Sequence, residues 1–145
     1  MIYSFQSDKI LKRKESDYKM KVAIIGSRGL NIEIPDYCIP ENTTQIVSGG
    51  AIGIDRKARE FAYRKGIQIL EIVPDYDLYG RRAPLKRNDV IIEYSDMVVA
   101  FWDGKSGGTG YVVNRCRKTG KRVVVYLVDK DGNIKEAPEQ LLFEF

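Results

Sequence analysis

The sequence predicts one α/β domain built on a doubly wound, mainly parallel sheet of about five strands with flanking helices. Its 145 residues are 43% hydrophobic and 30% charged, the balance of an ordinary globular domain, which argues against long disordered stretches. Five short apolar runs alternate with segments that have helical spacing. This alternation predicts parallel strands that are joined by right-handed crossovers.

The five predicted strands are short apolar runs, each bounded by turn residues. Most of them are continuous rather than alternating, which is typical of strands buried on both faces of a parallel sheet. They span residues 22–25, 45–48, 68–73, 97–102 and 122–128. The segment 31–44 contains Pro35 and Pro40, so we expect at most a short or irregular helix between the first two strands.

Two of the three predicted helices have clear end signals. Residues 55–65 place three apolar side chains on one face, with Asp55 as the expected N-cap and Gly66 as the stop. Residues 110–119 follow the fourth strand and stop at Gly120.

The remaining predicted helix precedes the fourth strand. Residues 83–94 begin with Pro84 near the first helical position, where proline is well tolerated. Their apolar spacing predicts that Val90, Ile91 and Tyr94 are buried against the sheet.

The two ends of the chain lie outside the alternating pattern. We assign residues 1–20 to an N-terminal extension, either a helix or a partner-binding arm, and residues 21–145 to the domain. After the fifth strand, residues 131–133 (Asp-Gly-Asn) predict a turn. The apolar residues at 141–145 are expected to dock back as a short helix or strand.

The composition excludes several classes of site. There is no histidine, so a serine–histidine–acid triad, a histidine general base and a histidine-bound metal are impossible. Cys38 and Cys116 are too few for a disulfide scaffold or a zinc cluster, and we expect free thiols. We therefore expect no metal and no cofactor.

The charge and hydropathy patterns bear on the partners and the compartment. Residues 1–21 hold six basic and three acidic side chains, so they contribute +3 of the net charge of +4 and the rest of the chain only +1. No apolar run approaches the roughly 20 residues that cross a bilayer, and no signal-peptide core is present. We expect a cytoplasmic protein with no membrane partner.

The candidate site lies in glycine-rich loops that follow the first, second and fourth predicted strands. In a parallel sheet these loops share the edge where ligands bind. Glycine permits positive φ and close approach of the backbone to a ligand, and N–H groups at a helix N-terminus favour an anion. A tight turn explains any one such loop, whereas three loops on one edge indicate a site. The loops span residues 26–29, 49–55 and 103–110.

Two arginines are candidate partners for an anion. A guanidinium can hold a phosphate or carboxylate through two parallel hydrogen bonds. For Arg87 the alternative is a solvated surface charge, for Asp55 it is a helix cap, and for Trp102 core packing competes with base stacking. The candidate ligand-binding residues are Gly26, Ser27, Arg28, Ser48, Gly49, Gly50, Gly53, Asp55, Arg87, Asn88, Asp103, Ser106, Gly107, Gly108 and Thr109.

Two common nucleotide-binding fingerprints are absent. Lys105-Ser106 precedes the glycines of the last loop, so the pattern Gly-x-x-x-x-Gly-Lys-Ser/Thr is missing. No Gly-x-Gly-x-x-Gly follows the first strand. An ordinary nucleoside triphosphatase or NAD dehydrogenase is therefore disfavoured.

The motifs form an ordered set that covers residues 21–128. They are Gly26-Ser27-Arg28, Ser48-Gly49-Gly50-Ala51-x-Gly53-Ile54-Asp55, Tyr79-Gly80-Arg81-Arg82-Ala83, Arg87-Asn88 and Ala100-Phe101-Trp102-Asp103-Gly104-x-Ser106-x-Gly108-Thr109. This set resembles the cpYpsA-related branch of the SLOG superfamily, which joins the DNA-processing protein A group with the Lonely Guy phosphoribohydrolases. The resemblance implies a Rossmann-like fold and a site for a nucleotide or nucleotide-derived ligand, with phosphate against Gly49, Gly50, Gly108 and Thr109.

The sequence departs from the phosphoribohydrolases at one position. Those enzymes carry Pro-Gly-Gly-x-Gly-Thr-x-x-Glu, whose glutamate serves N-glycosidic cleavage, and here the residue three beyond Thr109 is Val112. A valine can neither stabilise an oxocarbenium ion nor activate water. The resemblance therefore implies a ligand class more firmly than a reaction.

We expect a sensor or binding protein for a nucleotide-derived small molecule. One alternative is a nucleotide-processing enzyme, an N-glycosidase or phosphohydrolase that uses Asp55 or Asp103. Another is a single-stranded nucleic-acid binder like DNA-processing protein A. Its basic patch would be Arg115, Arg117, Lys118, Lys121 and Arg122. The oligomeric state stays open, with a homo-oligomer as one alternative.

Overall fold

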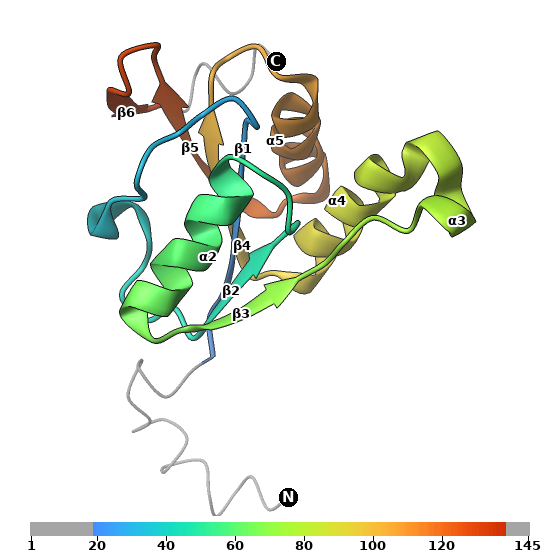
Figure 1. Ribbon diagram of the computed structural model, residues 1–145, viewed down its shortest axis with the longest axis horizontal. Coiled ribbons are helices and arrows are strands. Elements are labelled where there is room, and N and C mark those ends of the chain that lie inside the picture. Colours follow the sequence, from blue (N-terminus) through green and yellow to red (C-terminus); the bar gives the residue numbers. More distant parts are fainter. Residues whose placement is uncertain (1–18, 139–145) are drawn as a thin grey trace, which may run out of the picture.

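The computed structural model describes residues 19–138, which form a six-stranded sheet with helices on both faces (Figure 1). Most of the predicted N-terminal extension and the apolar stretch 141–145 lie outside the described residues. The strands are β1 (Lys21–Gly26), β2 (Gln45–Ser48), β3 (Gln68–Glu71), β4 (Met97–Trp102), β5 (Arg122–Val128) and β6 (Ile134–Glu136). The predicted α/β class is confirmed.

The strand order is β3-β2-β1-β4-β5-β6. The first five strands are parallel and β6 is antiparallel to β5. Because β1 and β4 are neighbours, the order reverses between them, and a crevice is expected over their carboxyl ends. Their register runs from Val22 opposite Met97 to Gly26 opposite Phe101, so the loops that follow both strands start side by side.

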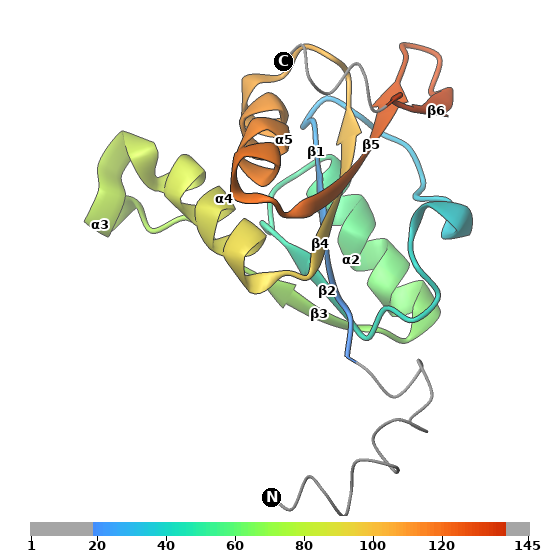
Figure 2. The ribbon, with the colours of Figure 1, turned by 180° about the vertical axis from the view of Figure 1, so that it is seen from behind.

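Two layers of helices cover the sheet. The helix α2 (Ile54–Lys65) packs on one face, and α4 (Ala83–Tyr94) and α5 (Gly107–Thr119) pack on the other, which Figure 2 shows from behind. Every residue of β4 is buried, as its continuous apolar run predicts. The link between β1 and β2 holds only the short 3-10 helix η2 (Asp36–Cys38), in agreement with the two prolines there.

The sheet differs from the prediction at its two edges. A sixth strand follows the predicted turn at residues 131–133, because Asp129 accepts hydrogen bonds from the N–H groups of Asp131 and Asn133 and closes a hairpin. This strand has only three residues, and two of them are exposed, so it lacks an apolar run. At the other edge, β3 ends at Glu71 rather than at residue 73.

Two helices begin earlier than predicted. The N-cap of α2 is Gly53, and Asp55 lies in its first turn instead of capping it. The helix α5 starts at Gly107, three residues before the predicted start. The prediction began the helix too late because Gly107 and Gly108 have low helix propensity. That low propensity matters less in the first turn of a helix.

The bounds of α4 agree with the prediction, but its predicted buried face is wrong. Ile91 is buried, whereas Val90 is 49% exposed and Tyr94 is 37% exposed. The face that meets the sheet instead carries Ala83, Arg87, Ile91 and Ile92. Ahead of α4 lie a helical turn that the sequence did not predict, α3 (Tyr76–Tyr79), and the 3-10 helix η3 (Gly80–Arg82).

Within residues 19–138, no helix is long and apolar enough to cross a membrane. The same residues contain no group of three or more acidic or cysteine side chains that could hold a metal ion. Cys38 and Cys116 are buried free thiols.

Candidate functional site

A cleft of about 440 Å³ opens at the carboxyl ends of β1 and β4. The loops after β1, β2 and β4 form one side of it, and the first turns of α4 form another. Most of the candidate residues line this cleft. They are Gly26, Ser27, Arg28, Gly49, Asp55, Arg87, Asn88, Asp103, Ser106, Gly108 and Thr109. The candidates Ser48, Gly50, Gly53 and Gly107 do not line it.

Packing explains the glycines at the base of the cleft. A Cβ atom on Gly26 would lie 2.6 Å from the carbonyl oxygen of Phe101, and one on Gly53 would lie 2.5 Å from that of Arg28. A Cβ atom on Gly49 would collide with the Arg87 guanidinium. These glycines let α2 and Arg87 pack closely against the loops, whether or not a ligand binds.

Backbone geometry separates Gly50 from the two glycines that begin α5. Gly50 has a φ of +71°, which only glycine adopts readily, so its turn accounts for it. Nothing lies within 4 Å of a Cβ atom built on Gly107 or Gly108, and neither residue has positive φ. Of these two, Gly108 lines the cleft. The fold itself therefore does not require the glycine that faces the open space.

The N-terminus of α5 offers unused hydrogen-bond donors. The N–H groups of Gly107, Gly108 and Thr109 have no acceptor among residues 19–138, whereas the N–H of Gly110 donates to the carbonyl of Ser106 at 3.1 Å. Unpaired N–H groups at the start of a helix carry partial positive charge and attract anions. Because Gly108 and Thr109 line the cleft, these donors border its interior.

A hydrogen-bond network ties the loop after β4 to the loop after β1. The Asp103 carboxylate accepts hydrogen bonds from the N–H of Lys105 at 2.8 Å and of Ser106 at 2.7 Å, and from the Ser106 hydroxyl at 2.8 Å. The hydroxyls of Ser27 and Ser106 also share a hydrogen bond. Partial burial raises the pKa of Asp103, but these hydrogen bonds outweigh it and hold the pKa below the ordinary value. Asp103 thus holds the loop after β4 in the conformation that lines the cleft.

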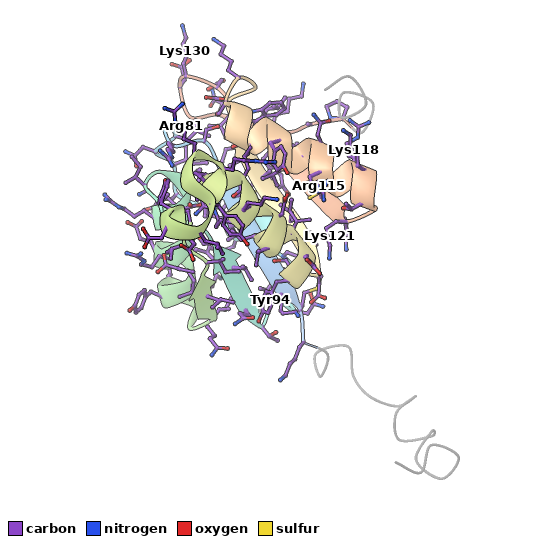
Figure 3. All side chains as sticks on the ribbon, turned by 90° about the vertical axis from the view of Figure 1, so that its right-hand side faces the viewer. Arg81, Tyr94, Arg115, Lys118, Lys121 and Lys130 are labelled. Atoms are coloured by element: carbon purple, nitrogen blue, oxygen red, sulfur yellow. The ribbon has the colours of Figure 1, made fainter. Side chains whose placement is uncertain are left out.

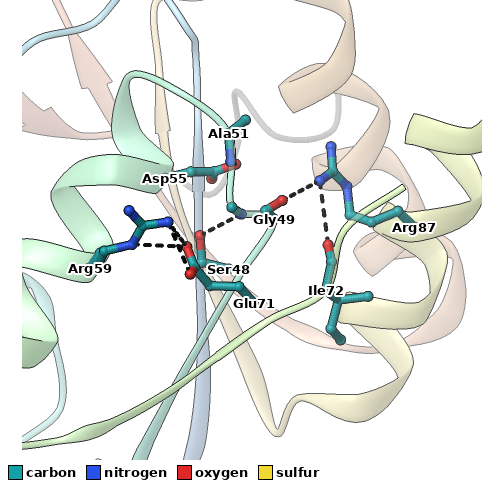
Figure 4. A network of polar contacts seen from close by, with 9 residues as sticks. Ser48, Gly49, Ala51, Asp55, Arg59, Glu71, Ile72 and Arg87 are labelled. Atoms are coloured by element: carbon teal, nitrogen blue, oxygen red, sulfur yellow. Dashed lines mark hydrogen bonds and ion pairs between the residues drawn. The ribbon is translucent and has the colours of Figure 1, made fainter. Parts of the chain in front are cut away.

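Arg87 lies beside the loop after β2 (Figure 4). It is only 8% exposed, so the alternative of a solvated surface charge is wrong. Its Nη1 donates to the carbonyl oxygens of Gly49 at 2.7 Å and Ile72 at 3.4 Å, and its Nε donates to Oδ1 of Asn88 at 2.9 Å. Burial lowers the pKa of this guanidinium, although Asp55 opposes the shift. The Nη2 hydrogens have no acceptor among the described residues.

Asp55 lines the cleft from the first turn of α2. Its Oδ2 accepts a hydrogen bond from the N–H of Ala51 at 3.1 Å, so it fixes the loop rather than capping the helix as an N-cap residue. Burial raises the pKa of this carboxyl, and the Ala51 N–H, Arg87 and Ser48 offset part of that rise.

Arg28 differs from Arg87 in having no fixed partner. It is exposed in the loop after β1 and lines the cleft, and its guanidinium has no hydrogen-bond or ion-pair partner in the described part of the chain. Arg59 and Glu71, also drawn in Figure 4, form an ion pair of 2.7 Å that ties α2 to β3.

Three other candidates fall outside the cleft. Trp102 is 5% exposed, packs in the core beside α5, and donates from Nε1 to the carbonyl of Ser106 at 3.0 Å, which decides for core packing over base stacking in the cleft. Val112 is fully buried between α5 and the sheet. In the predicted basic patch, Arg115 lies 3.7 Å from Asp89 and Lys121 donates to the carbonyl of Ser95 at 2.5 Å (Figure 3).

Sequence reasoning missed the apolar wall of the cleft. Pro84, Leu85 and Ile91 of α4 line it together with Ile25 of β1. Helical spacing could have identified this wall, because residues 84, 87, 88 and 91 lie three or four positions apart on one face of the helix that carries Arg87.

Comparison with known proteins bears on the fold. No protein-family model matches the sequence, and no curated protein matches it. Among solved structures, the chain is similar to DNA processing protein A from Helicobacter pylori, which was described for its mode of binding single-stranded DNA. The sequence identity is 24%, the TM-score is 0.59, and the match covers 89% of this chain and 74% of that chain. The two proteins therefore share a fold over most of their lengths.

Proposed function

We propose that this chain binds a nucleotide, or a phosphate ester derived from one, in the cleft at the carboxyl ends of β1 and β4. The observation that carries the proposal is the open space at Gly108, a cleft-lining glycine that the fold does not need and whose N–H has no acceptor among residues 19–138. Arg28 lines the same cleft with a guanidinium that has no hydrogen-bond or ion-pair partner among residues 19–138. This arrangement suits a dianionic phosphate.

The chemistry of the walls favours a nucleotide over inorganic phosphate alone. The cleft volume of about 440 Å³ exceeds what one phosphate needs and falls within the size range of small-molecule sites. The glycine loops and the N-terminus of α5 form a polar side, and Pro84, Leu85 and Ile91 form an apolar side. A ligand with a phosphate at one end and an aromatic base at the other matches both sides.

The side chains favour binding over turnover. When the three glycines of the phosphoribohydrolase motif are matched to Gly107, Gly108 and Gly110, the glutamate position holds Asn114, whose amide cannot act as a carboxylate, and Val112 is fully buried in the core. The Asp103 carboxylate is engaged by the loop that it closes. Asp55 is the cleft carboxyl with a raised pKa, but its Oδ2 accepts the hydrogen bond of Ala51.

Single-stranded DNA is the second candidate ligand. It is favoured by the similarity in fold to DNA processing protein A of Helicobacter pylori, whose structure concerns single-stranded DNA binding. The exposed Lys118 and Arg122 of the predicted basic patch would serve such a ligand. Against it, the residues beyond position 21 contribute only +1 to the net charge.

Two measurements test the proposal. Mass spectrometry of the protein purified under native conditions should detect a co-purified nucleotide as added mass. Calorimetric titration with nucleoside monophosphates and with ribose 5-phosphate should then give saturable binding of one ligand per chain. Absence of binding by every nucleoside monophosphate would overturn the proposal.

A further inference from the structure

A helical arm stands out from the body of the molecule next to α4 (Figure 1). We call residues 75–82 the arm; they comprise α3, η3 and the preceding Asp75, and every one of them is exposed. Three large side chains of the arm lie in solvent, since Tyr76 is 57%, Leu78 is 68% and Tyr79 is 44% exposed. These side chains contribute nothing to the core.

A single helical turn is unstable on its own, because nucleating a helix fixes several residues for one hydrogen bond. In the arm, that turn is held by Asp75, whose carboxylate accepts the N–H of Leu78 at 3.1 Å and whose carbonyl accepts the N–H of Tyr79 at 3.0 Å. The arm thus holds Tyr76, Leu78 and Tyr79 in a fixed arrangement outside the hydrophobic core of residues 19–138.

Two more large side chains, Val90 and Tyr94, are 49% and 37% exposed on the outer face of α4, beyond the arm. The Nζ of Lys86 lies 6.0 Å from the ring centroid of Tyr79. Val90 and Tyr94 follow Lys86 at four-residue spacing, so they lie on the same side of the helix. Figure 3 faces this side of the molecule, with Arg81 at its upper end and Tyr94 at its lower end. We call Tyr76, Leu78, Tyr79, Val90 and Tyr94 the arm face.

The arm has an acidic side chain near its start and basic side chains at its end, so two antiparallel copies of it would have complementary charges. Asp77 lies in the first turn of α3, and Arg81 and Arg82 end η3. None of these three has an ion-pair partner among residues 19–138. When two copies of such a segment run antiparallel about a two-fold axis, the acidic end of each meets the basic end of the other.

We propose that the arm face is the contact surface of a two-fold symmetric dimer of this chain. The apolar side chains form the centre of the contact, and Asp77 of each copy faces the arginines at the other end of its partner's arm. A stable dimer buries about 800 Å² per partner, more than one helical turn offers, so the continuation onto α4 is part of the contact. The proposal does not rest on the nucleotide site.

The chemistry of the arm face argues for a protein partner rather than a nucleic acid. The arm carries two acids, Asp75 and Asp77, against two arginines, Arg81 and Arg82, so it has no net positive charge to attract a phosphate backbone. Its tyrosines are interrupted by Leu78 and Val90, which have no ring on which a base could stack. A second copy satisfies both the apolar and the charged parts of the same surface.

Sedimentation analysis of the full chain over a range of concentrations tests the proposal. We expect a monomer–dimer equilibrium, and Leu78→Glu should raise the dimer dissociation constant about tenfold or more, because it places a charge at the centre of the contact. Tyr63→Glu is the matched control, since Tyr63 is 80% exposed on α2 away from the arm. Circular dichroism should show native helix content for both variants.

A charge exchange makes the test specific for the two-fold arrangement. Asp77→Arg and Arg81→Asp should each weaken the dimer, and the double variant should restore it, because the pair is then reversed across the axis. A wild-type chain that stays monomeric at every concentration would overturn the proposal, as would a dimer that Leu78→Glu leaves unchanged. If the wild type is monomeric and Leu78→Glu abolishes oligonucleotide binding, the arm face belongs to a nucleic acid and the dimer is wrong.

Discussion

The glycines around the cleft differ in what a side chain at each would meet. At Gly26 and Gly53 a Cβ atom would meet backbone oxygen, so any substitution there costs folding stability. At Gly108 the backbone has ordinary helical geometry and the Cβ atom would meet nothing within 4 Å. A substitution at Gly108 should therefore change ligand affinity, whereas a substitution at Gly26 or Gly53 should change the stability of the fold.

We expect Gly108→Val to weaken binding of a nucleoside monophosphate by tenfold or more while the melting temperature stays close to that of the wild type. The added side chain fills the approach to the N–H, and valine is at least as favourable as glycine in a helix. Gly107→Val is the matched control, because Gly107 is equally open but does not line the cleft. Calorimetry and thermal melts measure both effects. Equal affinity of the two variants would contradict the site.

Alanine substitutions of the two cleft arginines should differ in their effects: Arg28→Ala should change ligand affinity alone, whereas Arg87→Ala should also lower the stability of the fold. Arg28→Ala removes an exposed guanidinium with no hydrogen-bond or ion-pair partner among the described residues, so we expect about tenfold weaker binding at unchanged stability. Arg87→Ala leaves the buried carbonyl of Gly49 without its donor, so unfolding should also become easier, by about 2 kcal/mol.

The control for both substitutions is Arg122→Ala. Arg122 is exposed at the start of β5, at the amino ends of the parallel strands, whereas the cleft lies at their carboxyl ends. Urea denaturation and calorimetry distinguish the variants. The assignment of Arg28 fails if Arg28→Ala and Arg122→Ala bind the ligand equally well.

Because of Asp55, the free energy of unfolding of the protein should decrease as the pH rises. Its pKa in the folded protein is raised above the ordinary value by burial, so the folded state binds this proton more tightly than the unfolded state does. The stability that this proton contributes is fully present below the ordinary pKa of 3.8 and is lost as the pH rises through the raised pKa.

The substitution Asp55→Asn isolates this effect, because its amide oxygen can still accept the N–H of Ala51. We expect the free energy of unfolding of the wild type, relative to that of the variant, to decrease as the pH rises from 3 to 7. Urea denaturation at each pH provides the measurement. A relative stability of the wild type that increases with pH would show that the pKa of Asp55 is lowered instead.

At the scale of elements, apolar runs predicted the strands better than helical spacing predicted the helices. The strand β4 matches its prediction because all six of its residues are buried and apolar, so no face had to be chosen. In α4, apolar residues occur on more than one side, and only the packed structure shows that Val90 and Tyr94 lie on the outer side. The sequence could not predict α3 because one turn carries no periodicity.

The position of the candidate site could be predicted from the sequence, because the topology of a parallel sheet determines where its loops lie. The loops after β1, β2 and β4 had to share one edge once the sheet was parallel, and the cleft is found there. The individual reasons for the glycines were not predictable, because the contacts that exclude a side chain at Gly49 come from Arg87, which is 38 residues away in sequence.

The loop between β4 and α5 should depend on Asp103 in a pH-dependent way. Asp103→Ala removes an acceptor of two backbone N–H groups and one hydroxyl, and we expect a loss of about 1 kcal/mol of stability at neutral pH. Because the pKa of Asp103 is lowered, its stabilising contribution is present above the ordinary pKa of 3.8 and is lost as the pH falls through the lowered value. Denaturation of both proteins from neutral to acid pH should therefore show the difference shrinking. A difference that is constant with pH would contradict this role.

At the scale of the whole molecule, the charge distribution separates the two candidate ligands. A mononucleotide needs one anion site, which we propose lies in the cleft, whereas a single strand also needs basic side chains along a path. Outside residues 1–21 the chain contributes only +1 to the net charge, and Arg115 and Lys121 of the basic patch already contact Asp89 and the carbonyl of Ser95. The balance of charge favours the mononucleotide.

Salt dependence and competition provide the test. We expect the affinity for a nucleoside monophosphate to fall only slightly with salt, because one phosphate is neutralised, whereas each phosphate contact of a single strand adds about 0.7 to the slope of log K against log salt concentration. An oligonucleotide that enters the cleft should be displaced by excess mononucleotide, and Gly108→Val should weaken both ligands. If the oligonucleotide binds with a steep salt dependence, resists displacement and is unaffected by Gly108→Val, then the strand lies outside the cleft and nucleic-acid binding replaces the mononucleotide as the function.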